Sequence, residues 1–140
     1  MFQPSRDQVR EFFFAAWRHF KDAQPLTDLE KLAVEHIVRH PEYQAMLDRP
    51  DRYLDRDWPP ELGETNPFLH LSMHLSIDEQ LSIDQPPGVR SRYERIRHRL
   101  GDEHAAQHLV MDCLAEMIWR SQRDGQPPDG VAYLECIETK

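Results

Sequence analysis

Apolar residues recur along most of this chain at intervals of three and four positions, the spacing of one face of an α-helix. Near the start of the chain, this stripe consists of Val9, Phe12, Phe13, Ala16, Trp17 and Phe20. No segment alternates β-branched and polar residues as a half-buried strand does. The pattern predicts an all-α fold with helices over residues 7–22, 27–40 (ended or kinked at Pro41, with a further turn or two over 41–47), 66–84, 89–100, 102–124 and 129–138.

Residues that begin and end helices support these boundaries. Ser5 and Thr27 are each followed, three positions later, by the Gln or Glu of a capping box. Gly101 and Gly125 stand where two of the helices should stop. Residues 48–65 are polar and irregular, so we expect a long connection there.

These elements predict one domain over residues 1–140, built as an up-and-down bundle of five to six helices. The segment 66–84 carries apolar residues on nearly all sides, and we expect it to be the most buried helix. Trp17 and Trp119 lie on apolar stripes and are predicted to anchor the core.

Composition narrows the class of protein. A chain of 140 residues is long enough for one domain with a substantial core. Its formal net charge of −8 disfavours a general role on nucleic acid or on an anionic membrane. The N-terminus lacks the pattern of a secretory signal, and no segment reaches the ~18 apolar residues of a membrane span. Cys113 and Cys136 lack metal-knuckle spacing, so we expect two reduced thiols in a cytoplasmic protein.

Three pairs of histidines, each spaced i, i+4, are the main chemical signal. The spacing places both imidazoles of a pair on one helix face, one turn apart. Neutral imidazole is the commonest protein ligand for metals, and Zn, Fe or Ni suits such a site. The paired histidines are His36 and His40, His70 and His74, and His104 and His108.

An up-and-down topology would bring all three pairs to the same end of the bundle. We therefore expect a divalent transition-metal site formed first by His70, His74, His104 and His108. His36 or His40 is the next candidate ligand, and Asp112 is a possible carboxylate ligand. Catalysis by such a site is not predicted from any residue of the chain.

Several other sites are disfavoured. No His-Glu-x-x-His motif occurs, and residues 104–108 carry Gln107 where an inverted zinc-protease motif needs its general base. Nothing indicates a nucleotide or an organic cofactor. Two other functions stay open: a non-catalytic interaction module with structural buried histidines, which could form a homo-oligomer, and an anion or small-ligand pocket at helix N-termini.

A series of short motifs runs through most of the chain. They are HPEY at residues 40–43, NPFLHLSMHLSIDEQ at 66–80, D-x-P-x-G at 84–88, H-x-x-x-H at 104–108 and W-x-x-Q at 119–122. In this order the motifs resemble the bacterial domain of unknown function 1841 family. The resemblance implies a small, single-domain, helical and cytoplasmic bacterial protein, and it carries no assigned activity.

Overall fold

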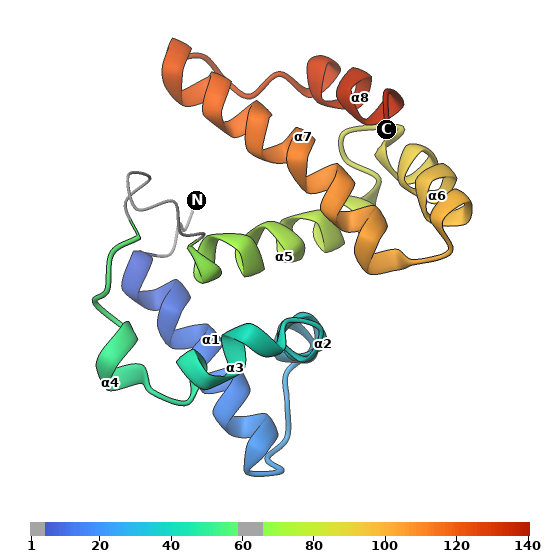
Figure 1. Cartoon of the computed structure of the whole chain (residues 1–140). Coiled ribbons are helices and arrows are strands. Elements are labelled where there is room, and N and C mark those ends of the chain that lie inside the picture. The colour runs from blue at the N-terminus through green and yellow to red at the C-terminus, as the bar shows by residue number, and fades with distance from the viewer. Residues whose placement is uncertain (1–4, 59–65) are drawn as a thin grey trace. The chain divides into compact units, whose positions relative to one another are not determined.

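The computed structural model describes residues 5–58 and 66–140, and within them the chain forms eight α-helices and no β-strand (Figure 1). The predicted all-α class is therefore confirmed. The helices are α1 (Arg6–Lys21), α2 (Asp28–Val38), α3 (Pro41–Leu47), α4 (Pro50–Tyr53), α5 (Pro67–Ile83), α6 (Val89–Leu100), α7 (Glu103–Asp124) and α8 (Gly130–Glu138).

The described residues form two helices beyond the six predicted ranges, and both begin at a proline. Pro41, expected to end or kink the preceding helix, starts α3 as a separate helix. Pro50 starts the single turn of α4, inside the connection predicted to be irregular. Proline is favoured at the first helical position because its missing N–H has no intrahelical partner there. The rest of that connection, residues 59–65, lies outside the described residues.

The predicted helix ends are confirmed in detail. Ser5 and Thr27 both form complete capping boxes, with Gln8 and Glu30. Gly101 and Gly125 follow α6 and α7 with φ angles of 68° and 63°, a left-handed conformation that favours glycine. Helix boundaries could be predicted because capping depends on residues only a few positions apart.

The helices group into two compact units, divided between Ser72 and Met73. In the first unit, α1 packs on α2 and α3, and α4 packs on α3. The first turns of α5 also belong to this unit, and Phe68 lies against Phe13 and Phe14 with ring centroids 6.5 and 5.4 Å apart. Trp17 is buried here, as predicted.

In the second unit, α6 and α7 pack together and α8 packs on both (Figure 1). Its core combines Ile77 from α5 with Val89, Tyr93, Ile96, Ala106, Val110, Met111, Cys113, Leu114, Tyr133 and Ile137. Within this unit the hydroxyl of Tyr133 donates to Gln80 Oε1 at 2.6 Å. The two units are described separately below, and the single domain and the up-and-down topology stay predictions.

Three expectations about side chains are wrong. Cys113 and Cys136 are not reduced thiols: they form a disulfide that joins α7 to α8. Helix α5, expected to be the most buried helix, leaves Leu69 and Ile83 54% and 57% exposed. Trp119 is 57% exposed and does not anchor the core. Among the described residues, no helix is long and apolar enough to cross a membrane.

Candidate metal centre

Three histidines of the second unit come together from two helices. His74 lies on α5, and His104 and His108 lie one turn apart on α7. One ring nitrogen from each histidine lies within 4.8 Å of those of the other two. The ring centroid of His74 lies 5.1 Å from that of His104 and 5.0 Å from that of His108, and the two α7 rings are 4.2 Å apart. We call His74, His104 and His108 the histidine triad.

The local sequence explains how α7 presents its two members of the triad. Asp102 caps the helix by accepting hydrogen bonds from the backbone N–H groups of His104 and Ala105, at 2.9 and 3.1 Å. His104 therefore lies in the first turn, and His108 follows on the same face one turn later. Both side chains are half-buried, whereas His74 is completely buried.

Two further side chains of the second unit support His74. Its Nδ1 atom lies 2.7 Å from Gln107 Oε1, and Gln107 Nε2 donates to Asp78 Oδ1, also at 2.7 Å. Gln107 is 7% exposed, and Asp78 is half-buried. These contacts form a chain of hydrogen bonds from the Asp78 carboxylate through the Gln107 amide to the His74 imidazole, which we call the row. The second ring nitrogen of His74, Nε2, lies on the other side of the ring.

The triad offers the donor atoms that borderline divalent metals prefer. Zinc binds imidazole nitrogen at about 2.0–2.1 Å, so ligand nitrogens around one ion lie roughly 3.3 Å apart in tetrahedral geometry. Nitrogens within 4.8 Å of one another need to approach by at most about 1.5 Å to reach that spacing. A carboxylate or carbonyl next to the far nitrogen of a ligating histidine is typical of zinc sites, and Gln107 Oε1 occupies that position for His74.

The first unit holds a different arrangement of histidines. His40 Nδ1 donates to the backbone oxygen of His36 at 2.7 Å, so its Nε2 atom carries the lone pair. That Nε2 atom lies 3.0 Å from His70 Nε2. The ring of Tyr43 stacks on His40 with centroids 5.1 Å apart, and burial raises the pKa of the Tyr43 hydroxyl. His36 and His40 are both buried.

Each unit therefore brings some of the predicted ligands together. Within the second unit these are His74, His104 and His108, and within the first they are His40 and His70. Asp112 is in neither set: its side chain is 68% exposed and lies 3.8 Å from Lys140 Nζ. A single site shared by all three histidine pairs stays a prediction.

Sequence reasoning missed the part played by Gln107 and Asp78. In the sequence, Gln107 stands out only as an amide in the place of the general base of an inverted zinc-protease motif. The spacing of Asp78 four residues after His74 was the available signal, but it does not show that a residue of α7 lies between them.

A family model described as Domain of unknown function (DUF1841) matches residues 5–139. The chain belongs to this family. The resemblance of the motifs at residues 40–43, 66–80, 84–88, 104–108 and 119–122 is thereby confirmed, and DUF1841 membership covers both units. No curated protein and no solved structure matches the chain.

The helix N-termini that an anion pocket would use are already occupied. Asn66 Oδ1 accepts from the backbone N–H groups of Phe68 and Leu69 at the start of α5. Asp102 does the same at the start of α7, and its carboxylate adds negative charge there. An anion would compete with these caps, so neither N-terminus favours an anion pocket.

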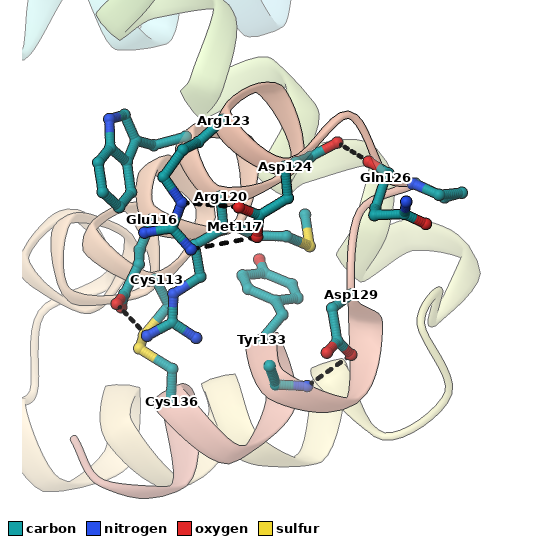
Figure 2. Close-up of a pocket in the computed structure, with 14 residues that line it drawn as sticks. Cys113, Glu116, Met117, Arg120, Arg123, Asp124, Gln126, Asp129, Tyr133 and Cys136 are labelled. Carbon is teal, nitrogen blue, oxygen red and sulfur yellow. Dashed lines mark hydrogen bonds and ion pairs between the residues drawn. A yellow bond between two sulfur atoms is a disulfide. The ribbon is translucent and has the colours of Figure 1, made fainter.

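The second unit also contains a cavity of about 610 Å³ where the end of α7 faces α8 (Figure 2). No histidine lines it. Its two arginines are paired with neighbouring carboxylates: Arg120 with Glu116 at 2.7 Å and Arg123 with Asp124 at 2.8 Å. Because these cations are already neutralised, the cavity does not favour an anionic ligand.

Proposed function

We propose that this protein binds a divalent transition-metal ion through His74, His104 and His108. The observation that carries the proposal is the convergence of three imidazoles from two helices, with their ligand nitrogens within 4.8 Å of one another. Zinc, iron and nickel all accept imidazole nitrogen, so the proposal names the class of ion and not one element. Catalysis is not part of it.

Electrostatics supports a metal at the triad. Three imidazoles packed with ring centroids 4.2–5.1 Å apart repel one another if they are protonated. They are compatible as neutral rings, which is the form that ligates a metal. A divalent ion would accept the lone pairs of the three rings. The close packing of the rings would then favour binding of the ion.

Structural histidines in an interaction module remain the second candidate function, and one observation favours it. The contact between His40 Nε2 and His70 Nε2 in the first unit, at 3.0 Å, has the length of a direct hydrogen bond between two imidazoles. Histidines of this chain therefore do make structural contacts. The two functions predict different responses of the protein to metal ions.

Thermal unfolding of tag-free protein with zinc, and with zinc plus a chelator, separates the two functions. A ligand that binds only the folded state raises the melting temperature. At a free concentration 100 times its Kd, it raises the free energy of unfolding by about 2.7 kcal/mol. We expect the chelator to remove this gain in the wild type. His104→Ala and His108→Ala should show no gain at all. His98→Ala, an exposed histidine on α6, is the matched control and should behave like the wild type.

An equal melting temperature with and without zinc, nickel or Fe(II) would contradict metal binding and would favour structural histidines. Alanine variants at the remaining predicted ligands, His36, His40 and His70, extend the series. Alanine at a true ligand reduces the gain in melting temperature that zinc gives. The cytoplasmic location stays a prediction. A disulfide is more typical of oxidising compartments, so the location is not part of the proposal.

A further inference from the structure

We propose that Gln107 is a positioning residue that, together with Asp78, holds the proton of His74 on Nδ1 and leaves Nε2 as the ligand atom. The metal part of this inference rests on the proposed function. The position of the proton does not, because it follows from hydrogen bonds inside the second unit.

The argument begins at Asp78, whose carboxylate can only accept hydrogen bonds. Gln107 must therefore turn its amide nitrogen toward Asp78, and Nε2 lies 2.7 Å from Oδ1. The amide oxygen of Gln107 then faces His74, and Oε1 lies 2.7 Å from Nδ1. A carbonyl oxygen also can only accept, so Nδ1 has to carry the proton.

The opposite direction of these hydrogen bonds is unfavourable at the Asp78 end. Reversing the amide would place Gln107 Oε1 against the carboxylate of Asp78, so that two acceptors would face each other without a proton. Burial makes this arrangement costly, because His74 is 0% exposed and Gln107 is 7% exposed. Water cannot easily replace a lost partner in such a place, and an unsatisfied buried group costs about 1–3 kcal/mol.

One turn of α7 supplies both metal ligands and the residue that orients His74. In the segment His104-Ala-Ala-Gln-His108, two ligands flank the residue that orients the third. This also explains an amide at position 107. A glutamate there would bring a second carboxylate to Asp78, whereas glutamine donates to Asp78 and accepts from His74 at once.

Asp78→Asn is the sharpest test of which groups donate and which accept in the hydrogen bonds from Asp78 through Gln107 to His74. Asparagine can donate as well as accept, so with Asn at 78 the hydrogen bonds can run either way. The readout is the ¹⁵N spectrum of metal-free protein labelled at histidine, in which protonated and bare ring nitrogens are distinct. The His74 signals are assigned by their loss in His74→Gln. We expect one tautomer, protonated on Nδ1, in the wild type, and a second population protonated on Nε2 in Asp78→Asn.

Gln107→Leu tests the metal half, because leucine keeps the bulk of the side chain and removes both hydrogen bonds. We expect its zinc affinity to fall about 10-fold or more, in line with losses of partners behind ligating histidines. Gln122→Leu, at an exposed glutamine on the same helix, should leave zinc affinity unchanged. Circular dichroism checks that each variant is folded.

A wild-type His74 protonated on Nε2, or the same single tautomer in Asp78→Asn, would overturn the inference. Unchanged zinc affinity in folded Gln107→Leu would overturn its metal half. If the wild type binds no zinc, the proposed function fails, while the nitrogen spectrum still decides where the proton lies.

Discussion

Cys113 on α7 and Cys136 on α8 form a disulfide, with Cα atoms 5.7 Å apart. The bond closes a loop with a sequence separation of 23 residues, and Cys113 is buried in the core of the second unit. A cross-link of this length removes conformational freedom from the unfolded chain and is worth about 3 kcal/mol. We therefore expect a reductant to lower the melting temperature of the wild-type protein by several degrees.

The double variant Cys113→Ser with Cys136→Ser is the control for this prediction. It should melt at the temperature of the reduced wild type and should not respond to reductant. α8 should stay helical in both cases, because Tyr133 and Ile137 also anchor it in the core of the second unit. A wild type that melts at the same temperature with and without reductant would contradict the stabilising role of the bond.

A second prediction concerns Arg10 of α1, which is 2% exposed. Its guanidinium donates to the backbone oxygens of Leu54 and Arg56, both at 2.7 Å, just after α4. Hydrogen bonds from a buried charged group are worth about 1.5–3 kcal/mol each. Arg10→Met loses both bonds and should therefore lower the free energy of unfolding by about 3 kcal/mol or more, measured by urea denaturation.

Arg6→Met is the matched control on the same helix. Arg6 Nη1 contacts Asp57 at 2.8 Å, but both side chains are more than half exposed. Exposed ion pairs contribute about 0–1 kcal/mol, so this variant should cost little. Equal losses in the two variants would show that Arg10 does not hold the segment after α4 in place.

Stability at low pH should depend on Glu30 of α2. Its pKa lies below the ordinary value of 4.5, mainly because the backbone N–H of Thr27 donates to the carboxylate and also because His19 lies 2.7 Å from it. A carboxyl whose pKa is lowered on folding stabilises the protein above the pKa of the unfolded chain. This contribution is lost as the pH falls below about 4.5 and the carboxylate takes up a proton.

Glu30→Gln removes this titration and should flatten the fall of stability below that pH. The measurement is urea denaturation at several pH values between 3 and 6. Glu35→Gln, an exposed glutamate on the same helix, should keep the slope of the wild type. If Glu30→Gln follows the wild-type slope, the depressed pKa does not contribute to folding.

Much of the helical pattern could be predicted because it depends on local chemistry. The starts of α1 and α2 follow from Ser5 and Thr27, and the end of α7 follows from Gly125. The turn of α4 escaped prediction because its surroundings are polar. Its partner Arg10 is more than 40 residues away in the chain. Spacing alone also could not pair Cys113 with Cys136, because that requires knowing that α8 packs on α7.

The candidate site shows the same division. The spacing of His104 and His108 predicts one shared helix face, and in the structure a ring nitrogen of His74 lies within 4.8 Å of theirs. The role of Gln107 was not predictable, because it depends on contacts between α5 and α7. Asp112 follows His108 by four residues, and each such step moves a side chain about 40° around the helix axis. Its exposed position therefore depends on how α7 is rotated about its axis, which spacing does not give.

Elemental analysis of tag-free protein tests the central claim most directly. The protein is stripped with a chelator, loaded with zinc, desalted and measured for metal per chain, alongside His74→Ala, His108→Ala and the control His98→Ala. Metal binding by the histidine triad predicts about one zinc ion per chain in the wild type and in His98→Ala, and much less in the two triad variants. A wild type that retains no zinc, nickel or iron, or triad variants that retain as much as the wild type, would contradict it.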